Sequence, residues 1–341
     1  MNLIKKWLPT TLFGYAILAL IPVLVLVSLT LGRFPIDVID AYLIVVSAVT
    51  PLTHSLDPIQ ETIILQIRLP RIGAALLVGA ALSVAGAAYQ GMFRNPLVSP
   101  DILGVSAGAG FGASLAILIS GEPILVQTMA FVWGMIAVGM TWAISRLHRP
   151  ASTLILVLAG IIVGTVFNAF VMLIKDIADP MDKLPEIVTW LMGSLAGTNW
   201  EHLISVTPAI VIGVGFLLLI RWRINILALG EEEATALGVD TRVLGTLIII
   251  AATVVTAAAV SISGVIGWVG LVIPHLSRML VGPEYTKMLP VSVVMGAAFL
   301  LIVDDIARTL TSSEIPLGVL TALIGAPFFA YLLTRKKVGW S

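Results

Sequence analysis

The chain has 341 residues, of which 59% are hydrophobic and 11% are charged, and its mean hydropathy is +1.08. A soluble domain has about 45–50% apolar and about 25% charged residues, so this composition excludes an ordinary soluble protein. The formal net charge is zero and gives no sign of a nucleic-acid partner, and without cysteine the sequence carries no information on disulfides.

Apolar runs of about 20 residues recur along the chain, and each is long enough to cross a bilayer as a helix. Because backbone groups in lipid must bond within their own segment, the expected fold class is all-α and polytopic. The ten predicted transmembrane helices lie at residues 10–32, 72–92, 100–120, 124–144, 152–175, 203–221, 242–262, 265–282, 290–308 and 316–334. No soluble domain fits between them, so residues 1–341 are predicted to form a single transmembrane domain.

The N-terminal segment begins with basic residues, as a signal peptide does. The apolar run behind it continues to about Leu31 without a small-residue cleavage site, so a retained first span is expected. Residues 184–200 form a further apolar stretch that is short and interrupted by glycine. They are an eleventh span or, alternatively, an external or re-entrant helix packed on protein.

Lysine and arginine concentrate on the cytoplasmic side of membrane proteins, which decides between ten and eleven spans. With ten spans, both termini are cytoplasmic and 13 of the 19 basic residues lie inside. The six outside are Arg33, Arg68, Arg71, Lys175, Lys183 and Arg308. With eleven spans only 6 of the 19 lie inside, so ten spans are predicted.

The segment from Arg94 to Gly112, RNPLVSPDILGVSAGAGFG, joins two of these spans. With Ala113 it matches the dinucleotide pattern G-x-G-x-x-A, but that pattern requires a preceding strand, and an apolar helix precedes it here. Ser99 and Pro100 instead predict the start of a helix, with glycines at 104, 108 and 112 on one face. The preceding span has a small-residue face of its own, comprising Gly79, Ala80, Ser83, Gly86 and Ala87. The stretch is therefore predicted to be a tight cytoplasmic turn between two closely packed helices.

Five long blocks resemble, in order, the FecCD-type permeases of bacterial ABC importers for iron chelates, haem and cobalamin. The blocks are QIRLPR at 66–71, VGAALSVAGAAYQGMFRNPLVSPDILGVSAGAG at 78–110, LALGEEEATALGVD at 227–240, GVIGWVGLVIPHLSRMLVGP at 264–283 and EIPLGVLTALIGAPFFAYLL at 314–333. The resemblance implies a type II importer permease in the bacterial cytoplasmic membrane. It implies a homodimer with two cytoplasmic ATPase subunits, which hold ATP and Mg, and one extracytoplasmic binding protein. The chain itself is then not an enzyme and binds no cofactor or metal.

Three outer arginines match family positions that dock the binding protein: Arg68, Arg71 and Arg308. Arginine suits this role because it forms bidentate pairs with carboxylates and stays charged at partly desolvated interfaces. The alternative is snorkelling or local pairing, since Asp304 precedes Arg308 by four residues and Glu314 is close in sequence.

A short helix that is too short to span follows the sixth predicted span on the cytoplasmic side. The resemblance implies that it is the coupling helix that seats in a cleft of the ATPase. Its residues are Gly230, Glu231, Glu232, Glu233, Ala234, Leu237 and Gly238. The glycines can open and close it, and Ala234 and Leu237 could dock in a partner groove. The alternative is a solvated connecting turn.

The resemblance also implies an inner gate formed by Asn95, Pro96 and Leu97, with Ser152 and Thr153 as a second constriction. Ser152 and Thr153 would equally serve as helix caps in any bundle.

The function expected is ATP-driven import of a metal chelate by alternating access. Ferric siderophore is the first candidate cargo, and haem, cobalamin and molybdate are alternatives. An ion-coupled secondary transporter would place ionisable residues near the membrane midplane, and the predicted span centres contain almost none. An intramembrane metalloenzyme would need clustered ligands, but the four histidines lack the H-E-x-x-H spacing.

Overall fold

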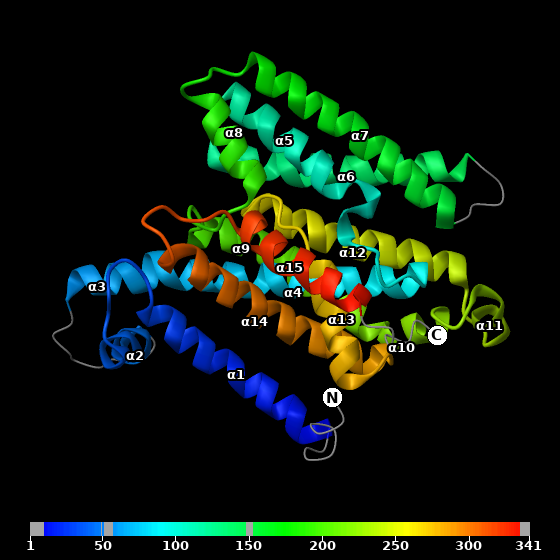
Figure 1. Ribbon diagram of the computed structural model, residues 1–341, viewed down its shortest axis with the longest axis horizontal. Helices are drawn as coiled ribbons and strands as arrows, with labels where there is room; N and C mark the ends of the chain where they lie inside the picture. The colour runs from blue at the N-terminus through cyan, green and yellow to red at the C-terminus, as the bar shows by residue number, and fades with distance from the viewer. Residues whose placement is uncertain (1–9, 49, 51–56, 148–152, 335–341) are drawn as a thin grey trace.

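The computed structural model describes residues 10–48, 50, 57–147 and 153–334, and its regular elements are all helices in these ranges. Figure 1 shows most of the long helices running along the longest axis of the molecule. The N-terminal elements are α1 (Thr10–Thr30), α2 (Val38–Ser47), α3 (Pro58–Thr62), the π-helical segment η2 (Ile63–Arg68) and α4 (Leu69–Phe93). The middle of the chain forms the 3-10 turn η3 (Pro100–Leu103), α5 (Val105–Ile119), α6 (Pro123–Arg146), α7 (Thr153–Ile177) and α8 (Lys183–Met192). The rest forms α9 (Trp200–Leu219), α10 (Arg221–Leu227), α11 (Glu231–Ala236), α12 (Thr241–Ser263), α13 (Val269–Val281), α14 (Tyr285–Thr309) and α15 (Leu317–Thr334).

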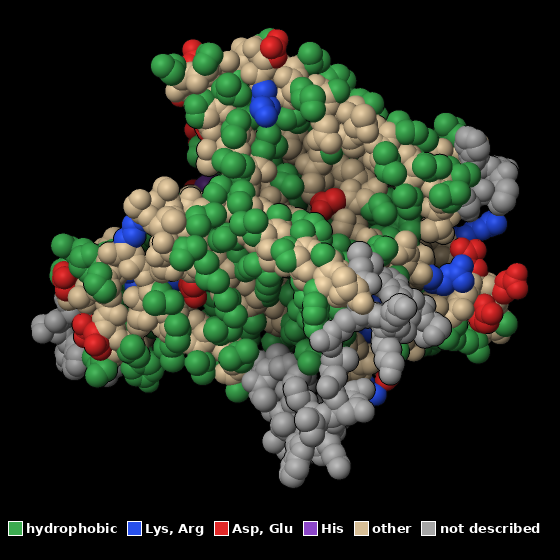
Figure 2. Space-filling model, viewed as in Figure 1, with side chains coloured by type: hydrophobic (Ala, Val, Ile, Leu, Met, Phe, Trp, Pro, Cys, Tyr) green, Lys and Arg blue, Asp and Glu red, His purple; other side chains and the backbone are tan. Residues whose placement is uncertain are grey.

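A helix lies in each of the ten ranges predicted as spans. In the described chain, six helices are long and apolar enough to cross a membrane. They are the continuous helical segment Pro58–Phe93 (α3, η2 and α4), Pro123–Arg146, Thr153–Ile177, Trp200–Leu219, Thr241–Ser263 and Tyr285–Thr309. Figure 2 shows apolar side chains across the middle of the visible face and most charged side chains at its ends. This distribution is that of a multi-pass membrane protein.

Side-chain caps fix the starts of several helices. The carboxylate of Asp240 accepts hydrogen bonds from the backbone of Arg242 and Val243, both at 3.0 Å, where α12 begins. The amide oxygen of Asn199 accepts from the backbone N–H of His202 at 2.9 Å, where α9 begins. Each cap satisfies donors that the first helical turn leaves unpaired.

The small-residue face of α4 is buried, but its neighbours differ from the prediction. A Cβ added to Gly79 would lie 2.1 Å from the carbonyl oxygen of Gly296 in α14, and one added to Gly86 would lie 1.9 Å from that of Gly270 in α13. The prediction that α4 packs closely on the next span is wrong, because α4 packs on α12, α13 and α14 whereas α5 packs on α6 and α7. The segment from 94 to 104 therefore connects α4 to a neighbouring group formed by α5, α6 and α7, and α12 contacts both α4 and this group.

The span predicted over 100–120 also begins later than expected. Residue Ser99 makes no capping bond, and Pro100–Leu103 form a 3-10 turn. Gly104 then adopts a left-handed conformation with φ of 85°, after which α5 begins at Val105. The sequence suggested one continuous helix because a glycine at this position is compatible with either structure.

Most of residues 184–200 is α8 (Lys183–Met192) and the loop that leads to α9 at Trp200. With ten residues, α8 is about 15 Å long at 1.5 Å per residue and too short to span. The chain then turns at Gly193, whose carbonyl oxygen accepts from the backbone N–H of Leu317 at 2.9 Å. The backbone N–H of Ser194 donates to the carbonyl of Ser263 at 2.8 Å. Residues 184–200 thus form a short helix and a turn that bonds to the end of α12 and the start of α15.

Candidate functional site

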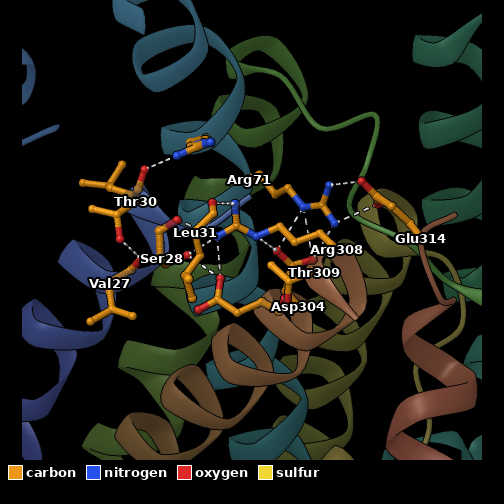
Figure 3. Close-up of polar contacts among 12 residues, drawn as sticks. Val27, Ser28, Thr30, Leu31, Arg71, Asp304, Arg308, Thr309 and Glu314 are labelled. Carbon is orange, nitrogen blue, oxygen red and sulfur yellow. Dashed lines mark hydrogen bonds and ion pairs between the residues drawn. The ribbon is translucent and has the colours of Figure 1, made fainter. Parts of the chain in front are cut away.

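Arg71 lies at the centre of an ion cluster between α4, α14 and the loop before α15 (Figure 3). Its Nε and Nη2 donate to the carboxylate of Asp304 over 2.9–3.1 Å, and Nη1 and Nη2 donate to Glu314, both at 2.9 Å. The Asp304 side chain is fully buried, whereas that of Glu314 is 30% exposed. Both edges of the Arg71 guanidinium are thus occupied by acids from its own chain.

Arg308 ties α14 to the end of α1. Its Nη2 donates to Asp305 at 2.5 Å and to the carbonyl and hydroxyl oxygens of Ser28 at 2.6 and 2.7 Å. Its Nη1 donates to the carbonyl oxygen of Leu31 at 2.8 Å (Figure 3). The pair with Asp304 that the four-residue spacing suggested is longer, at 3.9 Å.

Arg68 comes from the π-helical segment that precedes α4, and π-turns often mark functional sites. It donates to the carbonyl oxygen of Leu29, in the last turn of α1, and to that of Phe34, which follows the helix. Gly32 lies between the arginines, since a Cβ there would be 2.8 Å from Nη2 of Arg68 and 3.5 Å from Nη1 of Arg308. We call Arg68, Arg71, Arg308, Asp304, Asp305 and Glu314 the outer cluster.

The structure therefore brings the three predicted docking arginines together, but with relative exposures of only 5%, 8% and 7%. Local pairing, which was the alternative interpretation, is the arrangement observed. Burial alone would raise the pKa of Glu314, but hydrogen bonds from Arg71, its charge, and the charges of Arg33 and Arg308 hold this pKa below its ordinary value. Glu314 is thus the most accessible acid of a charge-balanced cluster.

The predicted inner gate lies in the loop that follows α4. Arg94 ends the helix in a left-handed conformation with φ of 48°. The side-chain oxygen of Asn95 accepts a hydrogen bond from the backbone N–H of Leu97 at 2.9 Å, and the side chain of Leu97 is 51% exposed. Thr153 is exposed at the start of α7, and Ser152 lies outside the described residues. No hydrogen bond among the described residues joins Thr153 to this loop.

A cavity of about 450 Å³ lies between the η3–α5 segment and α7. Its polar lining includes Asp101, Ser106, Thr165 and Asn168, and its apolar lining includes several glycines of both helices. The Asp101 carboxylate accepts a hydrogen bond from the hydroxyl of Ser106 in the first turn of α5. The sequence interpretation missed this cavity, although a polar Asn168 inside an apolar span was a usable signal.

The predicted coupling helix is present as α11, with Gly230 before it at φ of 149° and Gly238 after it at φ of 80°. The three glutamates at its start are exposed, and Leu237 is 61% exposed. Ala234 is fully buried within the chain, so of the two predicted apolar contacts only Leu237 is accessible to a partner. The segment lies at the opposite end of the molecule from α2 and α3 (Figure 1). The end of α14 bonds through Arg308 to the end of α1, which precedes α2.

A family model described as the FecCD transport family matches residues 20–335. The chain belongs to the FecCD transport family. The resemblance drawn from the five sequence blocks is thereby confirmed.

This FecCD chain is 43% identical to the molybdate import system permease protein MolB of Haemophilus influenzae, over 97% of both chains. It is 39% identical to the cobalamin import system permease protein BtuC of Halobacterium salinarum, over 97% of this chain and 90% of the relative. A third relative, a probable iron chelatin transport system permease protein of Helicobacter pylori, is 41% identical over 81% of this chain and 83% of its own.

Among solved structures, the FecCD chain matches a metal-chelate type ABC transporter in an inward-facing conformation, with a TM-score of 0.85 and 41% identity. The match covers 94% of this chain and 98% of the other. Together with the apolar helices, these similarities identify a multi-pass inner-membrane protein that serves as the permease of an ABC importer of the metal-chelate class.

Proposed function

We propose that this permease spans the membrane ten times with both termini in the cytoplasm and works as a homodimer. Two cytoplasmic ATPase subunits hydrolyse ATP with Mg, and one extracytoplasmic binding protein delivers the cargo. The observation that carries the proposal is that the start of α4 and the end of α14, which hold the outer cluster, lie at the opposite end of the molecule from α11 (Figure 1). Since the chain performs no covalent chemistry, its task is to change shape when nucleotide binds to its partners.

The outer cluster is the proposed docking surface for the binding protein, with contacts from Arg68, Arg71 and Arg308. Each arginine already has partners within the chain, so docking requires an exchange of partners. Glu314 is the partner suited to leave, because it lies on a loop and keeps 30% of its side chain exposed. A carboxylate of the binding protein would then replace it in the bidentate geometry that arginine favours.

The proposed cargo is a metal chelate, with ferric siderophore as the first candidate and haem and cobalamin as alternatives. Molybdate has a specific observation in its favour, since the relative named for it matches over 97% of both chains. Uptake of radioactive ferric siderophore and of radioactive molybdate by cells that express the complete importer distinguishes the two candidates. The cargo that accumulates in an ATP-dependent manner is the substrate.

The coupling role of α11 gives a direct test of the proposed function. Changing Glu231, Glu232, Glu233 and Leu237 to serine removes the exposed charges and the exposed apolar contact of this segment. Losing about 1.4 kcal/mol or more of partner contact lowers ATPase affinity about tenfold, so the ATPase should no longer co-purify or its hydrolysis should no longer drive uptake.

A matched control removes three exposed acids and one exposed apolar residue around the loop that joins α7 to α8. It changes Asp176, Asp182, Glu186 and Met181 to serine. Co-purification of the ATPase and cargo uptake should stay normal in this control. Normal coupled uptake in the α11 variant would exclude the coupling role.

A further inference from the structure

Gln90 is a buried polar residue in the last turn of α4, only 1% exposed. Its side-chain Nε2 donates to the carbonyl oxygen of Val98 at 3.4 Å and to that of Gly270 in α13 at 3.5 Å. Val98 directly follows the predicted gate residues. One amide group therefore ties the gate loop both to α4 and to α13.

Arg278, in the last turn of α13, holds the other end of this amide. Its Nη2 donates to Oε1 of Gln90 at 3.3 Å and to the hydroxyl of Tyr285 at 3.5 Å. A guanidinium only donates hydrogen bonds, so it fixes the amide oxygen of Gln90 toward itself and the amide nitrogen toward Val98. The orientation of Gln90 is therefore determined by its neighbours and not by solvent.

Further contacts connect Tyr285 to α10, the helix that precedes α11. The backbone N–H of Tyr285 donates to the side-chain oxygen of Asn225 in α10 at 3.1 Å. A Cβ added to Gly91 would lie 2.7 Å from Ile224 of α10 and 3.0 Å from the Tyr285 ring. The last turn of α4, the start of α14 and α10 are thus in close contact. The helix α11 follows α10 after three residues.

We propose that Gln90 is a positioning residue through which movement of α10 and α11 reaches the gate loop, by way of Asn225, Tyr285 and Arg278. This inference rests on the proposed function, which gives α11 and the gate loop their roles. A closely packed, hydrogen-bonded array transmits a displacement because it cannot absorb the displacement by local compression. When α10 moves with the ATPase, the Gln90 amide displaces the Val98 carbonyl and the gate residues before it.

The change Gln90→Glu tests this link selectively. Glutamate keeps the size of the side chain and still accepts from Arg278, but it cannot donate to the carbonyl oxygens of Val98 and Gly270. The matched control is Gln127→Glu in α6, since Nε2 of Gln127 also donates to a backbone carbonyl, that of His202, at 3.4 Å. This control lies outside the proposed chain of contacts.

The natural chain has no cysteine, so Leu97→Cys, at an exposed position of the gate loop, provides a single spin-label site. The distance between the two labels of the homodimer is measured in nanodiscs that contain the complete permease–ATPase complex, without nucleotide and after trapping with Mg·ATP and vanadate. A second series carries the label at Ala236→Cys, an exposed position in α11.

Nucleotide should shift the Leu97 distance in the natural background and in Gln127→Glu. Gln90→Glu should lose at least half of that shift while the Ala236 label still moves. An equal Leu97 shift in Gln90→Glu and Gln127→Glu overturns the inference alone. Labels that do not move with nucleotide in the natural background overturn the proposed function as well.

Two variants of Asn225 provide the same test if Gln90→Glu does not yield folded protein. Asn225→Asp keeps the acceptor for the backbone N–H of Tyr285 and should keep the shift, whereas Asn225→Leu removes the acceptor and should reduce it. An equal shift in these two variants contradicts the proposed route through Asn225.

Discussion

Arg71→Leu is expected to lower the free energy of unfolding by about 3–5 kcal/mol, because it leaves the fully buried carboxylate of Asp304 without its direct partner. The loss of attraction is the smaller part of this effect. The larger part is the cost of keeping an uncompensated charge away from water. Glu314 contributes less to the loss, since its side chain is 30% exposed and can be hydrated.

The double variant Arg71→Leu with Asp304→Asn separates burial of the charge from loss of packing. It removes both charges and should recover most of the lost stability, measured as the midpoint of thermal unfolding in detergent. Lys183→Leu is the control, because its ion pairs with Asp182 and Glu186 are 3.9 Å long and partly exposed and should contribute below about 1 kcal/mol. A single Arg71 variant as stable as this control would contradict the assigned pairing.

Gly86→Val is expected to destabilise the protein by about 3 kcal/mol or more, since added core volume that cannot be relieved by a rotamer change forces backbone displacement. A Cβ at this position would meet the carbonyl oxygen of Gly270 at 1.9 Å, and a backbone atom cannot move aside alone. The variant should therefore separate α4 from α13 and greatly reduce the yield of monodisperse protein.

Gly139→Val in α6 is the matched control for this prediction. It also places valine inside a long helix, but a Cβ there has no atom within 4 Å. Its yield and unfolding midpoint should stay close to those of the natural chain. A Gly86 variant that behaves like the Gly139 variant would show that α4 and α13 do not approach closely in the membrane.

The positions of the helices could be predicted from the sequence because long apolar runs have few alternatives in a bilayer. The small-residue face of α4 was also predictable from its spacing. Which helix covers that face was not, because periodicity identifies a face but not its neighbour. The sequence suggested α5, which is adjacent in the chain, whereas the structure brings α13 and α14 from about 200 residues away.

The candidate site was predictable to a similar degree. The charge pattern indicated that Arg68, Arg71 and Arg308 belong to one end of the bundle, and the structure brings them together. Their burial was not predictable, because it depends on contacts between distant parts of the chain. Arg71 pairs with Asp304 and Glu314, more than 230 residues away. Arg68 and Arg308 bond to the end of α1 and the residues after it. The contacts of Gln90 with α13 likewise depend on long-range packing that a single sequence does not contain.

The central claim is that the outer cluster and α11 lie on opposite sides of the membrane, and cysteine accessibility tests it most directly. Single cysteines are placed at Ser312, on the exposed loop beside Glu314, and at Glu232 in α11, in a chain that otherwise has none. Right-side-out membrane vesicles are then treated with a membrane-impermeant maleimide. The Ser312 cysteine should react in sealed vesicles, and the Glu232 cysteine should react only after permeabilisation. Reaction of both cysteines from the same side would contradict the account.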